Sequence, residues 1–277
     1  MDKFIQLTRP KVSLMVGLSS FAGACLFCAS INIRHLIVVL SVTLLSAGCS
    51  ALNQVQEVKR DKLMLRTSER PLVSGRVSKS AALMFALLLI ALSGALIINI
   101  SDYNSLLFIP FIMLIYNFTY TPLKPATPFA LLIGSVTGAV PPVMGYALMG
   151  GYPFNPNIMI IAGVLYLWQT PHFALLTIRY CEDYTRAGFK TLASEYGEEK
   201  EIAFIVLWLI SYFCALFLVT ASGLYLNVLS SAMHLALSIS FALLLIFFKG
   251  SSRLTFNILN LSAALFFLLL VVDRIIL

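Results

Sequence analysis

Charged residues are the component that this sequence most clearly lacks. Asp, Glu, Lys and Arg together make up 11% of its 277 residues, whereas hydrophobic residues make up 60%. Soluble domains carry roughly 25% charged residues, because most of their surface faces water. The composition therefore excludes an ordinary soluble domain and indicates a polytopic membrane protein.

Long polar segments and cysteines are also scarce. The longest polar stretches, residues 57–79 and 179–201, are only the size of loops, so the sequence predicts a single membrane-embedded domain over residues 1–277. Cys25 and Cys28 form a CxxC pair, but it lies within an apolar stretch and lacks the surrounding pattern of a redox or zinc domain. We interpret the cysteines as packing residues.

Stretches without Asp, Glu, Lys or Arg give the number of membrane spans, since a helix needs about 20 apolar residues to cross the hydrocarbon core. Five such windows hold one span each, and two longer windows hold two each: 12–33, 36–56, 80–101, 103–123 and 254–272, then 125–178 and 202–248. The predicted fold class is therefore all-α. We expect nine transmembrane helices in a bundle that encloses a central cavity capped by cytoplasmic loops.

The basic residues orient these spans, because cytoplasmic loops carry an excess of Lys and Arg. With the N-terminus in the cytoplasm and the C-terminus on the outer side, only Arg34 and Arg274 of the 19 basic residues lie outside. The net charge of +7 then belongs to a cytoplasmic membrane face, and no nucleic-acid partner is expected. The first span is too long for a cleaved signal peptide, and Met-Asp-Lys-Phe leaves no room before it for a transit peptide. We expect a bacterial inner membrane.

An amide and two carboxylates fall at the end of the second span. Asn53, Glu57 and Asp61 are spaced by four residues, so a helix places them on one face. Oxygen ligands suit Mg²⁺, which usually shares its shell with waters and substrate phosphates. Arg66 and Arg70 follow at once, which favours a magnesium-bridged phosphate or diphosphate site. The alternative is an ordinary loop in which acids pair with neighbouring bases.

A second polar group follows the sixth span. Helical spacing places Gln169, His172 and Asp183 on one stripe together with Leu176 and Arg179, and Pro171 is expected to kink or open the helix. An intramembrane histidine is by default a functional residue, although an interhelical hydrogen bond would also explain it. Asp183 could equally be a solvated helix end. We expect the polar loops 57–79 and 179–201 to cap the same cavity.

The third group surrounds the fourth and fifth spans. Lys124 is the only charged residue between 103 and 178 and could contact a phosphate, or else serve as an anchor at the membrane surface. Gly134 and Gly138 provide a small-residue face for close helix packing. Pro141 and Pro142 are expected to break or bend the fifth span.

Taken together, these motifs resemble the protohaem IX farnesyltransferases, or haem O synthases, of the UbiA superfamily of intramembrane prenyltransferases. The resemblance covers roughly residues 7–190. It rests on six motifs in the same order: Asn53-x3-Glu57-x3-Asp61, Arg66-Thr-x2-Arg70-Pro-Leu-Val-Ser-Gly-Arg76, Tyr120-Thr-Pro-Leu-Lys124, Gly138-Ala-Val-Pro-Pro-Val-Met-Gly145, Trp168-Gln-x-Pro-His-Phe173 and Asp183-Tyr-x2-Ala-Gly188.

The resemblance implies a role for each of these groups. Asn53, Glu57 and Asp61 would form the first acidic motif and Asp183 the centre of the second, with Mg²⁺ held by Glu57, Asp61 and Asp183. The prenyl donor would be farnesyl diphosphate, its diphosphate bound by cationic side chains, and the acceptor would be haem B, placed in a pocket between the helices. The residues implied for these two subsites are Arg66, Arg70 and Lys124 for the diphosphate, and Tyr120, Trp168, Gln169 and His172 for the haem.

The sequence also departs from the family pattern. Glu57 stands where the family has Asp, Lys59 where it has a further Asp, and Pro125 where it has a basic residue. Two alternatives therefore stay open: a prenyltransferase acting on a quinone-precursor ring, and a non-catalytic haem-binding assembly factor for a terminal oxidase. The lipid bilayer, and haem A synthase or a terminal oxidase, are the expected partners.

Overall fold

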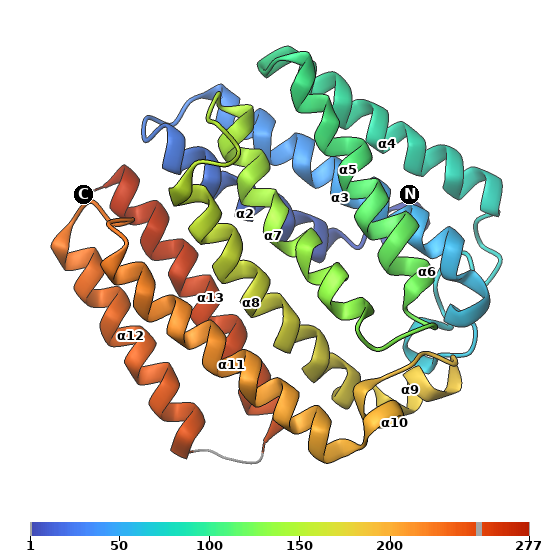
Figure 1. The fold of residues 1–277 in the computed structure, drawn as a ribbon. Helices are drawn as coiled ribbons and strands as arrows, with labels where there is room; N and C mark the ends of the chain where they lie inside the picture. Colours follow the sequence, from blue (N-terminus) through green and yellow to red (C-terminus); the bar gives the residue numbers. More distant parts are fainter. Residues whose placement is uncertain (1, 248–250, 277) are drawn as a thin grey trace.

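The computed structural model describes residues 2–247 and 251–276, which are helical with short connections (Figure 1). Within these residues nine helical segments are long and apolar enough to cross a membrane. They are α2 (Pro10–Phe27), α3 (Ile33–Asp61), α4 (Lys79–Ile100), the composite segment Tyr103–Leu123, α7 (Ala130–Leu148), α8 (Pro156–Arg179), α11 (Glu198–Ala221), α12 (Val228–Phe247) and α13 (Ser252–Ile275). The predicted fold class and span count are confirmed, and the protein is a multi-pass integral membrane protein.

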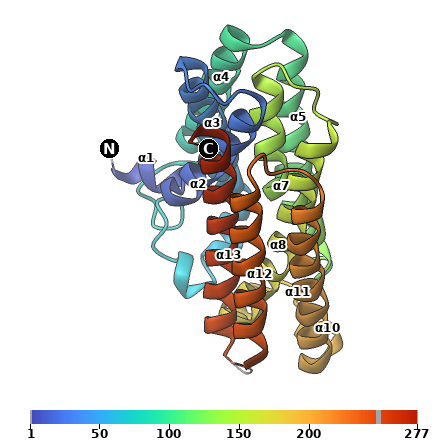
Figure 2. The same cartoon turned by 90° about the vertical axis from the view of Figure 1, so that its left-hand side faces the viewer.

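Four short helices complete the fold. They are α1 (Asp2–Leu7), η1 (Leu65–Thr67), α9 (Cys181–Arg186) and α10 (Leu192–Tyr196). Figure 2 shows α1 and the segment after α3 on the same side of the bundle, where an Arg76 guanidinium nitrogen donates a 3.2 Å hydrogen bond to Gln6 Oε1. The segment after α3 is thereby held against α1.

The fourth span is irregular. It consists of η2 (Tyr103–Leu107), α5 (Phe108–Met113), the π-helix η3 (Leu114–Tyr120) and α6 (Thr121–Leu123). Asn117 fixes the π-helix to α3, because its Nδ2 donates to Cys49 O at 3.0 Å and to Gln56 Oε1 at 3.2 Å. π-Helices are uncommon and occur frequently at functional sites.

Helices α2 and α7 cross at very short range. A Cβ atom added to Gly23 would lie 1.9 Å from Pro142 O, and one added to Gly145 would lie 1.8 Å from Ser20 O. Glycine at these two positions lets the backbones approach, as small residues do in membrane helix pairs. Helix α7 runs through Pro141 and Pro142 without interruption, so the two prolines do not break it, and the alternative, a bend at this point, stays a prediction.

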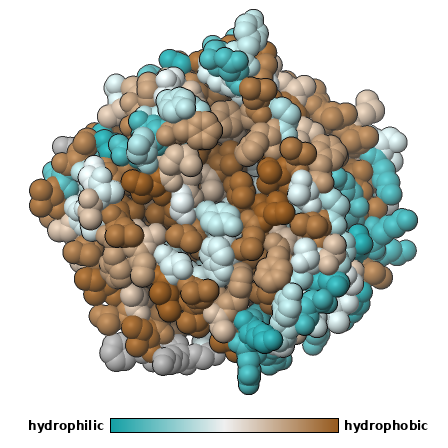
Figure 3. All heavy atoms as spheres, in the orientation of Figure 1, coloured by the Kyte–Doolittle hydropathy of each residue, from teal (hydrophilic) through white to brown (hydrophobic). Residues whose placement is uncertain are grey.

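The surface agrees with a membrane setting. In Figure 3 apolar residues cover most of the visible face, while hydrophilic residues gather at its lower right, over α9, α10 and the end of α3. Large apolar side chains such as Met84, Leu207 and Leu218 are exposed, as lipid contact requires. Side chains fill much of the bundle interior, and the enclosed central cavity stays a prediction.

Candidate active site at one end of the bundle

The last turns of α3 carry the first acidic motif. Asn53, Glu57 and Asp61 are 0%, 5% and 1% exposed, so an amide and two carboxylates are buried on one face of the helix. Helix α3 continues five residues beyond the last residue of its charge-free window, which brings Glu57 and Asp61 into the same regular helix as Asn53. Burial of such groups is costly unless each finds a partner.

Each member of the motif has a partner outside α3. Lys124 Nζ lies 2.9 Å from Glu57 Oε1, and an Arg70 guanidinium nitrogen lies 2.5 Å from Asp61 Oδ2. Asn53 Nδ2 donates a 2.9 Å hydrogen bond to Thr121 Oγ1. The segment after α3 and the end of the fourth span therefore both close over the same face of α3.

The loop after the sixth span joins this site. Asp183 Oδ1 accepts a 2.8 Å hydrogen bond from the backbone N–H of Leu65, and its Oδ2 accepts a 3.2 Å bond from that of Arg66. Arg186 lies 3.7 Å from the same carboxylate. The two polar loops thus meet, as the sequence predicts, and Asp183 fixes the backbone from which Arg66 projects. Each carboxylate oxygen keeps a further lone pair for another ligand.

Arg66 itself is oriented by an aromatic ring. Its guanidinium lies 4.5 Å from the centre of the Tyr180 ring, in a cation–π contact. Its side chain is exposed, and within the described part of the chain it forms no ion pair with a carboxylate. Arg66 is therefore a cation at this end of the bundle that is accessible to an anion.

Arg9 is a site residue that sequence reasoning missed. It precedes Pro10 and has φ 46° and ψ 62°, the left-handed region that a non-glycine residue rarely adopts. Burial alone would lower the pKa of Arg9, but Tyr116, Glu57 and Asp61 outweigh it, so the pKa is raised. Arg9 is therefore a permanent cation that lies close enough to the acidic motif to interact with it electrostatically. In the sequence Arg9 is one of many bases beside a span, and only its place before Pro10 distinguishes it.

The pKa values of Lys124 and Arg70 are lowered, in contrast to that of Arg9. Burial lowers the pKa of Lys124, and Glu57 offsets part of this effect. Burial and the neighbouring Arg9 lower the pKa of Arg70, while Asp61 raises it. Cations that have lost their water without complete compensation are stabilised when a further anion arrives.

The acidic face of α3 offers oxygen ligands of the kind that Mg²⁺ binds. Asn53 Oδ1 and Asp61 Oδ1 are buried and lack hydrogen-bond partners among the described residues, so two oxygen ligands are available on one face. Within the same part of the chain, no three His, Cys, Asp or Glu side chains lie close enough to hold a metal ion by themselves. The residues fit a magnesium ion that takes its remaining ligands from phosphate and water, and they do not fit a closed protein cage.

The prediction that Asp183 shares a helix face with Gln169 and His172 is wrong. Helix α8 ends at Arg179, Tyr180 has φ −121° and ψ 31°, and α9 begins at Cys181. The chain therefore changes direction before Asp183, which does not continue the α8 face. Pro171 does not interrupt α8, contrary to the opening considered for it.

The residues implied for the acceptor pocket divide between two neighbours of α8. Gln169 faces α7, because a Cβ on Gly138 would lie 2.6 Å from Gln169 Oε1. Trp168 Nε1 instead donates a 3.1 Å hydrogen bond to Leu259 O of α13, and His172 Nδ1 lies 2.9 Å from Asn260 Oδ1 of the same helix.

Tyr120 belongs to the acidic end of the bundle. Its ring stacks on Phe173 with centres 5.9 Å apart and an angle of 9°, and Lys124 Nζ lies 4.6 Å from the ring centre. Tyr120, Lys124, Phe173 and Tyr184 also line a small pocket of about 40 Å³. An aromatic wall therefore adjoins the buried lysine.

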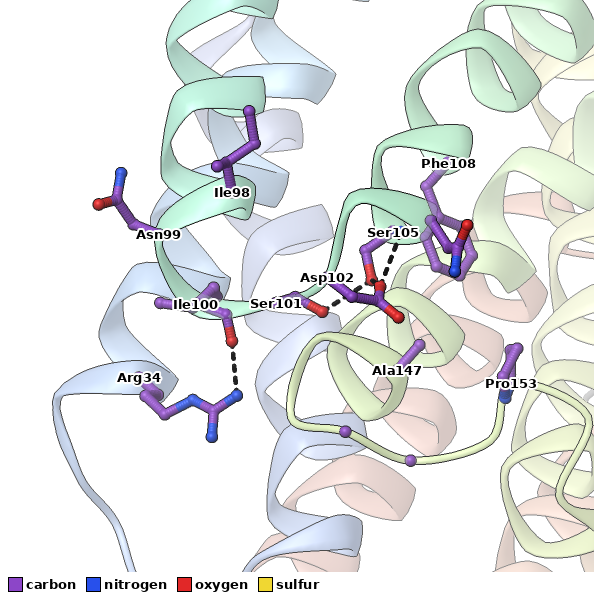
Figure 4. A pocket seen from close by; sticks show the side chains of 13 residues that line it. Arg34, Ile98, Asn99, Ile100, Ser101, Asp102, Ser105, Phe108, Ala147 and Pro153 are labelled. Carbon is purple, nitrogen blue, oxygen red and sulfur yellow. Dashed lines mark hydrogen bonds between the residues drawn. The ribbon is translucent and has the colours of Figure 1, made fainter.

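A larger pocket, of about 570 Å³, lies at the other end of α3 and α4 (Figure 4). A guanidinium nitrogen of Arg34 donates a 2.6 Å hydrogen bond to Ile100 O, and Asp102 Oδ1 accepts a 2.9 Å bond from Ser105 Oγ. These polar groups are used to hold helix ends together. The pocket is therefore separate from the acidic motif.

Comparisons with known proteins bear on this arrangement. Residues 15–271 match the model of the UbiA prenyltransferase family. The chain is 37% identical over 215 residues to a protoheme IX farnesyltransferase of Nitratidesulfovibrio vulgaris, covering 78% of this chain and 75% of the relative. It is 33% identical over 280 residues to a protoheme IX farnesyltransferase of Oleidesulfovibrio alaskensis, covering 98% and 95%.

The fold also matches a solved structure. A UbiA homologue from Archaeoglobus fulgidus, bound to GPP and Mg²⁺, superposes with a TM-score of 0.71 at 18% identity, covering 98% of this chain and 99% of that one. At this identity the likeness concerns the fold.

Proposed function

The chain belongs to the UbiA prenyltransferase family and is a prenyltransferase; we propose that it transfers the farnesyl group of farnesyl diphosphate to a vinyl group of haem B, which yields haem O. The observation that carries the proposal is the set of cations closed over the acidic face of α3. Lys124, Arg70 and Arg9 come from three separate segments and surround Glu57 and Asp61. An oxygen-rich face ringed by desolvated cations suits a diphosphate.

The donor end acts on the leaving group. Arg66, Arg70, Lys124 and Arg9 bind the diphosphate oxygens. Glu57, Asp61 and Asp183 would hold Mg²⁺ jointly with phosphate oxygens and water, and the ion would neutralise part of the diphosphate charge. When the allylic C–O bond breaks, its electron pair leaves with the diphosphate. Charge therefore grows on the leaving group, and cations already positioned there stabilise the transition state more than the ground state.

Ionisation is followed by three steps: stabilisation of the allylic cation, formation of the C–C bond and addition of water. The allylic cation left by ionisation lies beside ring faces such as those of Tyr120 and Phe173, whose quadrupoles stabilise positive charge. The vinyl group of the haem donates its π electrons to the allylic carbon and forms the new C–C bond. Water then adds to the resulting cation and loses a proton, which gives the hydroxyethylfarnesyl side chain.

The acceptor assignment rests on the named relatives and on residues of α8. Two relatives that match over most of the chain are named protoheme IX farnesyltransferases. We assign Trp168, Gln169 and His172 to the haem side of the site. Haem is planar and largely apolar apart from its two propionates, so we expect a haem substrate to reach α8 and α13 from the bilayer. The proposed location is a bacterial inner membrane with the N-terminus in the cytoplasm, where haem A synthase or a terminal oxidase would take up the product.

Analysis of haems by mass spectrometry tests the proposal. The chain is expressed in a bacterial host that makes haem B but no haem O, and haems are extracted from its membranes. Haem O is expected with the wild type and with Glu182→Ala, an exposed neighbour, and is expected to be absent with Asp183→Ala. A farnesylated aromatic ring in place of haem O would refute the haem assignment, and no prenylated product at all would refute the activity.

A further inference from the structure

Two of the three histidines are fully used in hydrogen bonds. His35 Nε2 lies 3.0 Å from Cys28 O, and its Nδ1 accepts from the backbone N–H of Asn32. His234 Nε2 lies 2.9 Å from Leu216 O, and its Nδ1 lies 3.0 Å from the hydroxyl of Tyr225. A carbonyl oxygen can only accept, so both rings carry their proton on Nε2.

His172 has the opposite arrangement, and Asn260 sets it. Asn260 Nδ2 donates a 2.7 Å hydrogen bond to Phe256 O, which can only accept. The amide nitrogen must therefore face Phe256, and the amide oxygen must face the imidazole. Asn260 Oδ1 lies 2.9 Å from His172 Nδ1, so Nδ1 is the protonated nitrogen.

The second nitrogen of His172 then carries a lone pair. Within the residues that the structure describes, His172 Nε2 has no hydrogen-bond partner. The ring lies among aromatic side chains, with the centres of Trp168 and Phe256 each 4.8 Å away. A neutral imidazole whose Nδ1–H is held by an amide oxygen and whose Nε2 is unprotonated is the form that binds metals.

We propose that Asn260 is a positioning residue for the acceptor: it holds His172 as the Nδ1–H tautomer and thereby presents Nε2 as an axial ligand to the iron of the haem substrate. The inference rests on the proposed function for the presence of haem. A hydrogen bond from the distal nitrogen of a ligating histidine fixes the orientation of the ring and increases its basicity. Aromatic faces beside the ring provide flat apolar contacts of the kind a porphyrin needs.

The tautomer can be measured without haem. In ¹⁵N spectra of histidine-labelled protein in nanodiscs, we expect two rings protonated at Nε2 and one at Nδ1, the latter assigned by His172→Gln. Asn260→Leu should abolish the Nδ1–H signature. Asn257→Leu removes an exposed amide from the same helix and should leave it unchanged. An Nε2–H form of His172 in the wild type, or an unchanged tautomer in Asn260→Leu, would overturn the inference.

The ligation is measured with ferrous haem B. Resonance Raman spectra should show an iron–histidine stretching band in the wild type that is absent from His172→Ala. Asn260→Leu should weaken haem binding about 10- to 100-fold, as loss of an outer partner does at metal sites. Asn260→Asp, whose carboxylate is a stronger acceptor, should keep the band and move it to higher frequency. The KM for farnesyl diphosphate should not change in either variant.

The outcomes separate the two proposals. If the wild type makes haem O while His172→Ala and Asn260→Leu retain its haem affinity and spectrum, the positioning role is refuted and the proposed function stands. If the wild type shows the Nδ1–H tautomer but binds no haem and makes no haem O, the proposed function is refuted, and the assignment of Nε2 as an iron ligand with it.

Discussion

Replacing Asp183 with alanine is expected to release the segment after α3 as well as to stop turnover. The carboxylate accepts from the backbone N–H groups of Leu65 and Arg66 at 2.8 and 3.2 Å and is buried. Hydrogen bonds to a charged acceptor contribute about 1.5–3 kcal/mol each, so the pair contributes about 3 kcal/mol or more. At 1.4 kcal/mol for each factor of ten, the two amides should exchange with solvent about 100-fold faster in the variant.

Hydrogen–deuterium exchange of the nanodisc-embedded protein measures this effect. Peptides covering residues 62–70 should exchange faster in Asp183→Ala, whereas Glu182→Ala, on the same short helix but exposed, should exchange at the wild-type rate. Asp183→Asn keeps one acceptor oxygen and should give an intermediate rate while still losing turnover. Wild-type exchange at Leu65 and Arg66 in Asp183→Ala would show that the carboxylate does not hold the loop, and the reasoning would fail.

Four further outcomes test the site. Glu57→Asp should retain substantial activity with an altered magnesium dependence, whereas Glu57→Gln should lose most of it; equal rates would show that charge at this position is irrelevant. Asp61→Ala should lose at least about 100-fold in kcat at every magnesium concentration while inserting normally, which turnover assays on purified protein measure. Arg9→Gly removes the backbone strain together with the charge, so thermal stability should change by less than about 1 kcal/mol while the KM for farnesyl diphosphate rises about tenfold or more. His172→Ala should weaken haem binding more than farnesyl diphosphate binding, as judged by titrations of each substrate; the reverse order would place His172 in the donor pocket.

The sequence could predict the features that depend only on consecutive residues of one segment. Hydropathy is a property of about 20 consecutive residues, so the span count follows from the windows, including the pairs of spans in 125–178 and 202–248. The shared face of Asn53, Glu57 and Asp61 follows from helical spacing for the same reason.

The features that sequence could not predict depend on contacts between segments. Helix α8 ends at Arg179, just before Tyr180, although neither Gly nor Pro occurs there. The Arg66 guanidinium that packs on Tyr180 comes from a segment more than a hundred residues earlier. Pro171, the local signal for a break, lies inside an intact helix because neighbouring groups in a membrane bundle accommodate it. Asn260 lies beyond residue 190, where the sequence offers no motif.

The helical segment from Leu114 to Lys124 should tolerate no inserted or deleted residue during evolution, because its length sets the position of Lys124. One residue added or removed in an α-helix turns everything after it by about 100° and shifts it by 1.5 Å. Such a change within Leu114–Tyr120 would turn Lys124 away from Glu57, 2.9 Å from it at present. Loops at the opposite end tolerate added residues at little cost in free energy. Insertions and deletions among relatives should therefore collect in those loops and spare the interval from Leu114 to Lys124.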